Sequence, residues 1–205
     1  QADADVINAE IEALPSVDKA TLTNKPAVDT AKGNYDALAP YVKDFVKAEN
    51  VAKLNALVAK MEQLQAEADA EEAQNAANTF KTTYAAVLAL TVDTVATTNE
   101  TDVDNVLNAY NSLTPAAAKD LLITEKALLD SLKARIEAIK AVNAATNPAA
   151  MRTAIEDAAL GLDLTEYNNL LGAQKDIVAQ YMINNKPDGG YTDTASVQAV
   201  LDAAI

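Results

Sequence analysis

The feature that most constrains the fold is an internal repeat, in which a pattern of apolar and proline residues returns 75 residues later. In the first copy the pattern consists of Val28, Tyr35, Leu38, Pro40, Leu54, Leu57, Met61 and Leu64. In the second copy the matching residues are Val103, Tyr110, Leu113, Pro115, Leu129, Leu132, Ile136 and Ile139. Because a constant period over many positions is the signature of a repeated structural unit, we expect both copies to fold alike.

Composition favours helix within each copy. Of the 205 residues only 5 are glycine and 6 are proline, while alanine, leucine, glutamate, lysine and glutamine dominate. These dominant residues lose little side-chain freedom in a helix. In the first copy, apolar residues at helical spacing predict helices over 5–14 and 26–38 and a third helix from residue 51. Three amphipathic helices around one apolar face predict a three-helix bundle in an all-α protein.

The third helix of the first bundle is expected to continue as the first helix of the second. No glycine or proline lies between Pro40 and Pro115, and the apolar stripe resumes after an alanine-rich passage. This pattern predicts one helix over 51–88, about 57 Å long at the usual rise per residue. Its middle, residues 67–72, carries four acids and no large apolar residue, which indicates exposure. We therefore expect two tandem three-helix bundles that share a long connecting helix and form an elongated rod.

These patterns divide the chain into three parts, namely a bundle over 1–70, a second bundle over 71–146 and a small compact helical domain over 147–205. The last part is expected to contain shorter helices, separated by glycine and proline turns, over 148–159, 164–171, 173–184 and 193–204. A threonine- and valine-rich run over 90–98 is compatible with a strand or with a short extended loop.

Three local signals mark helix starts. Thr114 and Asn147 each precede a proline, which suits an N-cap followed by the first helical residue. Asp163 and Glu166 have capping-box spacing, with aspartate in place of the usual serine or threonine. All three are therefore expected to cap helices.

A motif around a tyrosine occurs in both copies and, more faintly, a third time. The first copy has Tyr35 and Leu38 followed by Lys43-Asp44-Phe45-Val46. The second has Tyr110 and Leu113 followed by Lys119-Asp120-Leu121-Leu122, with one extra residue between. The third has Tyr167 and Leu170 followed by Lys175-Asp176-Ile177-Val178. The tyrosines suit a ligand pocket or a core anchor, and we interpret them as anchors with the hydroxyl at the bundle edge.

Composition also excludes several functions. The chain has no cysteine, histidine or tryptophan, which removes disulfides, thiolate metal sites and the commonest general base. Thirty acids against 16 bases give a net charge of −14, which disfavours nucleic acid as a partner. No apolar stretch approaches the roughly 20 residues needed to span a bilayer. We therefore predict that the chain is not an enzyme and has no catalytic residues, no cofactor, no metal ion and no membrane insertion.

Two candidate sites in the sequence also have ordinary structural explanations. The acids Glu10, Glu12, Glu62, Glu67, Glu71 and Glu72 fall opposite the apolar stripe, which favours a solvated helix face over a catalytic carboxylate pair. The run 184–195 follows part of a calcium-loop register through Asn184, Lys186, Asp188 and Gly189. Lysine at the second ligand position and Ala195 at the twelfth favour a turn instead. Asp102 and Asp104 suit the first turn of a helix, and Asn99-Glu100-Thr101 is a glycosylation sequon.

The repeated unit resembles helical modules of Gram-positive bacterial surface proteins, including S-layer proteins and large adhesins. The resemblance is carried by Ala109-Tyr110-Asn111-Ser112-Leu113-Thr114-Pro115 with Leu129, Leu132 and Ile136. The C-terminal part is also similar to a module of such proteins, through 142–146, 151–155, 161–164, Tyr167 and 197–204. The resemblance implies an extracellular place on the cell envelope and a structural role.

Together these observations predict a rod-like spacer or assembly module of an S-layer-type surface protein. Its expected partners are neighbouring domains of the same protein and other copies of it. The alternative is an adhesin module that binds a host or matrix protein through an exposed helix face, which requires a contiguous apolar patch.

Overall fold

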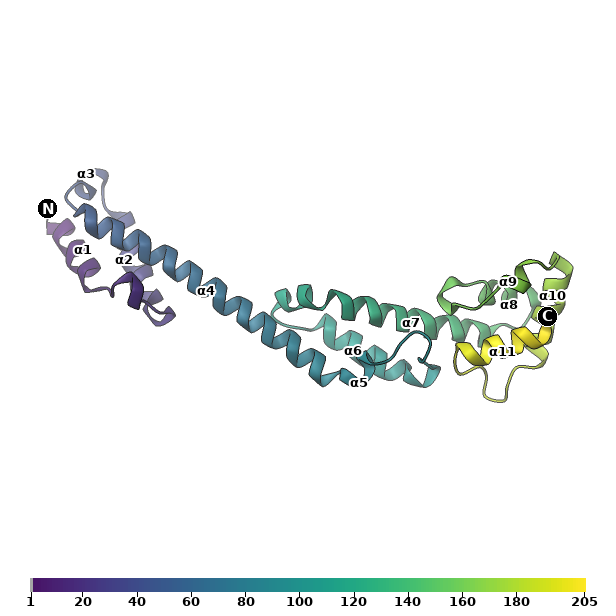
Figure 1. Ribbon diagram of the computed structural model, residues 1–205. Helices are drawn as coiled ribbons and strands as arrows, with labels where there is room; N and C mark the ends of the chain where they lie inside the picture. The colour runs from purple at the N-terminus through teal and green to yellow at the C-terminus, as the bar shows by residue number, and fades with distance from the viewer. Residues whose placement is uncertain (1) are drawn as a thin grey trace. The chain divides into compact units, whose positions relative to one another are not determined.

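The computed structural model describes residues 2–205, and it confirms an all-α protein, with no strand among those residues. The chain forms two compact units, which meet in sequence between Glu72 and Ala73. Figure 1 shows the helices of each unit along the chain. Each unit is built from amphipathic helices that bury one face against their neighbours.

The first unit contains helices connected by short loops. They are α1 (Ala2–Ala13), the 3₁₀ turns Val17–Lys19 and Leu22–Asn24, α2 (Lys25–Ala37), α3 (Pro40–Lys43) and the first part of α4 (Ala48–Thr83). The second unit contains the rest of α4, α5 (Ala85–Leu88), a 3₁₀ turn at Thr97–Asn99, α6 (Glu100–Asn111), a 3₁₀ helix at Ala116–Leu122, α7 (Ile123–Ala144), α8 (Pro148–Ile155), a 3₁₀ turn at Ala158–Leu160, α9 (Thr165–Asn168), α10 (Gly172–Asn184) and α11 (Thr194–Ala204).

The internal repeat is visible in the helix boundaries. The helices α2 and α6 begin 75 residues apart, and so do α4 and α7. Both α2 and α6 follow a 3₁₀ turn whose last residue, Asn24 or Asn99, accepts a backbone N–H through its Oδ1 atom, at 2.9 Å from Thr21 and 3.0 Å from Ala96. The side chain of Asn99, the sequon asparagine, is therefore part of a local turn. These two asparagines are not part of the apolar and proline pattern that defines the repeat in the sequence.

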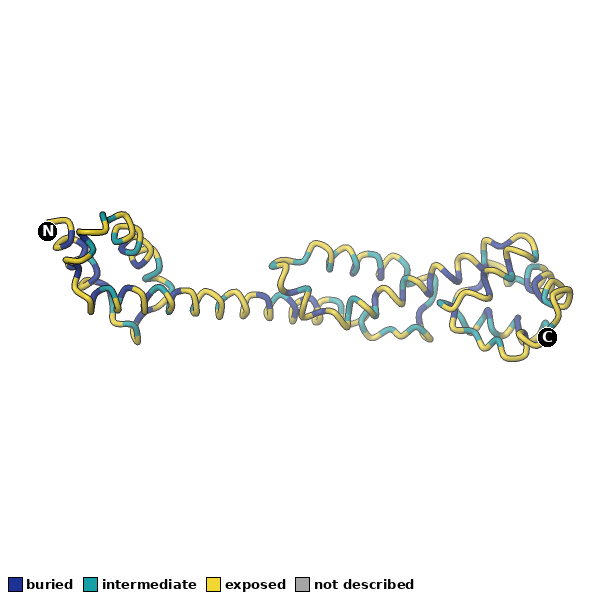
Figure 2. The backbone as a smooth tube through the Cα atoms, turned by 90° about the horizontal axis from the view of Figure 1, so that it is seen from above, coloured by how far each residue is buried: buried dark blue, intermediate teal, exposed yellow. Residues whose placement is uncertain are grey.

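Equivalent core positions of the two copies are buried alike. Leu54 and Leu57 of α4 and their counterparts Leu129 and Leu132 of α7 are all 0% exposed. Figure 2 colours the backbone by burial, and buried positions recur as dark blue segments along the helices. The prediction that the repeated apolar residues form the core is confirmed, and it follows from a shared helical period.

Helix α7 contributes to more than one hydrophobic cluster of the second unit. Leu129 packs with the clusters of α4 and α6, Leu132 and Ile136 pack around Val95, and Ile139 packs with α8, α10 and α11. Residues on both sides of position 146 therefore pack against α7 and belong to one compact unit. The division into three domains at 70 and 146 stays a prediction.

The long helix is shorter than expected. It begins at Ala48 and ends at Thr83, and Tyr84, with φ −107° and ψ 19°, separates it from α5. Two threonines precede the interruption, and β-branched residues lose side-chain freedom against the preceding helical turn. Apolar periodicity predicted an unbroken helix through Tyr84 because the residues after the break still pack on the same core.

The acidic middle of α4 is exposed, as its composition predicted. Glu67, Asp69, Glu71 and Glu72 all lie on the surface, and the backbone there is mostly exposed (Figure 2). Helical structure in this stretch therefore depends on the high propensity of its alanines and on pairs such as Gln65 with Asp69, where Nε2 lies 2.7 Å from Oδ1.

The run 90–98 is a loop rather than a strand. It makes an isolated bridge between Ala96 and Asp193, and the N–H of Thr97 donates to the carbonyl of Thr192 at 2.8 Å. Val95 is fully buried in this loop. The valine and threonine content that suggested a strand therefore reflects a short extended segment packed against the helices.

The helix-start signals have three different outcomes. Asn147 is the N-cap of α8, and its Oδ1 accepts the N–H of Ala150 at 3.0 Å. Thr114 is not an N-cap, because Pro115 stands at that position and the following helix is 3₁₀. Asp163 accepts the N–H of Thr165 at 2.9 Å, but Leu164 is the N-cap, so the predicted box with Glu166 is wrong.

Candidate functional site: the repeated tyrosine–lysine motif

The three motif tyrosines lie in or against the hydrophobic cores. Tyr167 is fully buried, and Tyr35 and Tyr110 are partly buried against the core of their own copy. A bulky ring at this position fills space that the surrounding alanines leave empty. The interpretation of these residues as core anchors agrees with their positions.

In each copy the motif lysine lies over the ring of the motif tyrosine. The distance from Nζ to the ring centroid is 5.3 Å for Lys43 and Tyr35, 5.9 Å for Lys119 and Tyr110, and 4.5 Å for Lys175 and Tyr167. These separations suit cation–π attraction. The extra residue of the middle copy is accommodated because a 3₁₀ helix replaces α3 there.

The first two motif lysines also close the end of a helix. Lys43 Nζ donates to the carbonyl of Asp36 at 2.9 Å, and Lys119 Nζ donates to the carbonyl of Asn111 at 2.6 Å. These carbonyls lie at the C-termini of α2 and α6, where backbone acceptors lack helical partners and the dipole favours a cation. One side chain therefore covers the ring and caps the helix.

An exposed apolar residue follows the Lys-Asp pair in every copy. Phe45 is 57% exposed, Leu121 is 43% exposed and Ile177 is 68% exposed. The next residue is buried in each case, at Val46, Leu122 and Val178. We call Phe45, Leu121 and Ile177 the exposed motif residues. Sequence periodicity could not separate them from core residues, because both kinds lie side by side in the motif.

Tyr167 has a hydroxyl with an unusual environment. The hydroxyl donates to Oε1 of Glu156 at 3.1 Å. Burial, together with this carboxylate, raises the pKa of Tyr167 to about 12. The folded protein therefore stabilises the neutral form of the Tyr167 side chain.

We expect the stability of the second unit to fall as pH rises from about 10 towards 12, because the unfolded chain releases the Tyr167 proton at a lower pH than the folded one. Tyr167→Phe removes this contribution, so the variant should lose less stability over that interval than the parent. Chemical unfolding at pH 7, 10 and 11.5 measures the difference. Equal losses of stability in both proteins would contradict the raised pKa of Tyr167. Lysine titration occurs in both proteins and therefore does not contribute to the difference between them.

The carboxylates that gather in the second unit are held by lysines. Lys133 Nζ lies 2.9 Å from Asp104, 3.0 Å from Glu137 and 3.3 Å from Glu100, and Lys140 Nζ lies 2.6 Å from Glu100. The hydrogen bonds that Lys133 donates to Asp104 and then to Glu137 raise the pKa of Lys133. Those that Lys140 and then Lys133 donate to Glu100 lower the pKa of Glu100. The network connects α6 to α7 and keeps these groups ionised.

A buried arginine, not singled out from sequence, supports the junction of α7 with the loops around Gly161 and Thr194. Arg135 is only 6% exposed, and its guanidinium donates to the Leu160 carbonyl and, at 2.7 Å, to Thr194 Oγ1. Its Nε has no partner within residues 2–205. Gly161, with φ 60°, brings its backbone directly against the guanidinium. Arg135 therefore holds the 3₁₀ turn Ala158–Leu160 and the first residue of α11 against α7.

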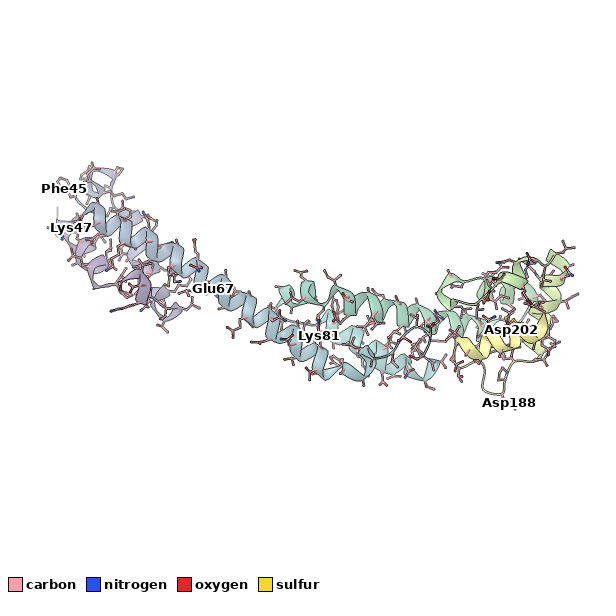
Figure 3. The ribbon with its side chains drawn as sticks, viewed as in Figure 1. Phe45, Lys47, Glu67, Lys81, Asp188 and Asp202 are labelled. Atoms are coloured by element: carbon pink, nitrogen blue, oxygen red, sulfur yellow. The ribbon has the colours of Figure 1, made fainter. Side chains whose placement is uncertain are left out.

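A polar hollow of about 450 Å³ lies close to this arginine. Two of its acids accept hydrogen bonds, since Gln198 Nε2 donates to Asp202 Oδ1 at 2.7 Å and the N–H of Thr165 donates to Asp163 Oδ1 at 2.9 Å. Gln198 Oε1 also accepts the backbone N–H of Asp163 at 2.8 Å. The Thr165 hydroxyl and backbone N–H hold the pKa of Asp163 below its usual range. Figure 3 shows Asp202 on α11. These contacts fasten α11 to the loop before α9.

The loop that resembled a calcium site forms a turn. Gly190 donates its N–H to the carbonyl of Pro187 at 2.8 Å, and Lys186 Nζ donates to the carbonyl of Asn143 at 2.9 Å. Asp188 lies at the tip of the loop (Figure 3). Across the described residues 2–205, no three carboxylates converge as a metal site would require. In the same part of the chain, no helix is long and apolar enough to cross a membrane.

Comparison with known proteins identifies one similar segment. A protein named gellan lyase, from a Bacillus species, is 51% identical over 71 residues, which are 35% of this chain and 3% of that protein. The chain therefore spans a very small part of the length of this relative. No protein-family model matches the chain. No solved structure matches it either.

This similarity corrects one expectation. The prediction that the chain is not an enzyme is contradicted, because a relative that shares half of the residues in the matched segment bears the name of an enzyme. The absence of histidine and cysteine led to that prediction. Composition describes only the residues of this chain, whereas the similarity connects 71 of them to a far longer protein.

Proposed function

We propose that this chain is a spacer and assembly module of a large S-layer-type protein on the envelope of a Gram-positive bacterium, and that modules of the same kind occur in extracellular enzymes. The observation that carries the proposal is the presence of an exposed apolar residue after Lys-Asp in all three copies. The similarity to gellan lyase supports it, because 71 residues is close to the 75-residue period of the repeat.

The exposed motif residues are suited to contacts with other copies of the same repeat. Each has a second exposed apolar residue within four positions, namely Tyr41 near Phe45, Ile123 near Leu121 and Tyr181 near Ile177. A single small apolar contact is weak, but several contacts along one chain add through their linkage. A second chain of the same sequence presents the same three apolar residues, so the partner we propose is another copy of this chain.

Net charge determines the conditions for this association. At −14 the copies repel one another, and salt screens that repulsion over distances of about 10 Å at 0.1 M. Apolar contact, in contrast, is not weakened by sodium chloride. Association should therefore increase with ionic strength.

We expect the chain to self-associate in sedimentation velocity as protein concentration and sodium chloride increase. The triple variant Phe45→Ser, Leu121→Ser and Ile177→Ser should remain monomeric under the same conditions. Val6→Ser is the matched control, because Val6 is 65% exposed but lies outside the motif. A parent chain that stays monomeric at high salt, or a control that loses association equally, would overturn the proposal.

A further inference from the structure

The second unit contains a groove between the C-terminal end of α4 and the C-terminal end of α6. Its volume is about 400 Å³, within the range of small-ligand sites. The side chains that give it chemical character are Thr79, Phe80, Thr83, Tyr84, Ser112 and Thr114. All of them lie within the second unit.

The groove has an aromatic wall and a hydroxyl rim. The rings of Phe80 and Tyr84 lie 4.9 Å apart at 57°, with Phe80 buried and Tyr84 partly exposed. The rim consists of the four Thr and Ser hydroxyls, which accept and donate hydrogen bonds. No charged residue lines the groove, although the chain carries 46 charged side chains, 30 acidic and 16 basic. A ligand that fits has an apolar face, polar edges and no charge.

The first copy of the repeat shows what closes this groove. Buried Ala4, Ile7 and Ile11 of α1 have the same spacing as buried Ala77, Phe80 and partly buried Tyr84 of α4. This register is an offset of 73 residues, two fewer than in the later helices, and it places Ile7 and Ile11 where the second copy has its two aromatic rings. It also places Glu10 at the position of Thr83.

A hydrogen-bonded bridge lies across the equivalent position of the first copy. Asn34 Nδ2 donates to Glu10 Oε1 at 3.0 Å and to Oε2 at 3.1 Å. By the 75-residue offset, Asn34 corresponds to Ala109, which lines the groove in the second copy. The second copy thus replaces the bridge with a short hydroxyl side chain and a methyl group, and the groove is open.

We propose that this groove binds an uncharged sugar unit of an oligosaccharide or polysaccharide. A sugar ring presents an apolar C–H face to the Tyr84 ring and hydroxyl edges to the rim. A second hollow of about 410 Å³ shares Thr79 and Thr83 with the groove and adds the amides Asn75 and Asn78 along α4. Adjoining hollows with amide and hydroxyl groups suit a second unit of the same sugar chain. This binding activity is separate from self-association.

The test rebuilds the closed form of the groove in the full chain. The double variant Thr83→Glu with Ala109→Asn introduces the pair that bridges the first copy. Thr101→Glu with Ala127→Asn makes the same kinds of substitution at exposed positions of α6 and α7 and is the matched control. Binding of cellohexaose, maltohexaose and gellan is measured by isothermal titration calorimetry, and folding is checked by thermal unfolding.

We expect at least one of these saccharides to bind the parent and the control alike, and to bind the double variant about tenfold more weakly or worse, at an unchanged unfolding midpoint. Tyr84→Leu, which removes the ring but keeps an apolar side chain, should also weaken binding. If the parent binds none of the three saccharides, or if both variants bind as the parent does, the proposal is wrong. Because each assay uses monomeric protein at low salt, its outcome is independent of the self-association experiment.

Discussion

Leu57→Ala and Leu132→Ala are each expected to lower the free energy of unfolding of their own unit by about 2–5 kcal/mol. Both leucines are completely buried at equivalent positions of the two copies. Truncation removes apolar contacts and leaves a cavity that close-packed neighbours fill only in part. Hydrogen exchange measured segment by segment would assign the loss to residues up to Glu72 for Leu57→Ala and to the later residues for Leu132→Ala.

An exposed leucine provides the control for this experiment. Leu121→Ala changes the same side chain at a position that is 43% exposed, and it should alter stability by roughly 0.5 kcal/mol or less. A nearly neutral effect of Leu57→Ala or Leu132→Ala would show that the helix face assigned to the core is wrong. A large effect of Leu121→Ala would show that this exposed motif residue is required for folding.

Gly161→Ala is expected to destabilise the second unit by about 3 kcal/mol, the second large effect that the structure predicts. The backbone of Gly161 has φ 60°, a conformation that costs about 1–2 kcal/mol for a residue with a β-carbon. The new methyl group would also lie 2.6 Å from Nη2 of Arg135. Moving this guanidinium breaks its hydrogen bond to Thr194 and disturbs a buried charge.

Gly33→Ala is the control for the glycine substitution. Gly33 lies inside α2, and a β-carbon there meets no atom within 4 Å. Alanine in a helix interior is favoured over glycine by roughly 0.5–1 kcal/mol, so this change should stabilise the first unit. Chemical unfolding of both variants measures the contrast. A harmless Gly161→Ala would mean that Arg135 is free to leave its buried position without cost.

Much of the fold could be predicted because its causes are local. The helices α2, α8, α10 and α11 lie within a few residues of their predicted ranges, since propensity and punctuation by glycine and proline act over short stretches. Errors occurred at helix ends. Tyr84 interrupts α4, and Pro115 displaces Thr114 from the cap.

The candidate sites could be predicted only in part. The sequence showed the Tyr–Lys spacing of all three copies, but the contact of each lysine with its ring depends on how the chain turns between them. The exposed motif residues, Arg135 and the groove at Tyr84 carry no sequence signal that distinguishes them from ordinary core or surface residues. Each depends on side chains from separate helices.

The sequence by itself determined that this protein is all-α, that its core repeats after 75 residues, and that the acids of α4 are exposed. Those properties follow from helix propensity and from a regular apolar period, which any short window of the chain expresses. Only the tertiary structure decided that Glu10 and Asn34 bridge one copy while Thr83 and Ala109 leave the other open. The physical reason is that a bridge or a groove is formed between helices, and the side chains on its two sides are far apart in the sequence.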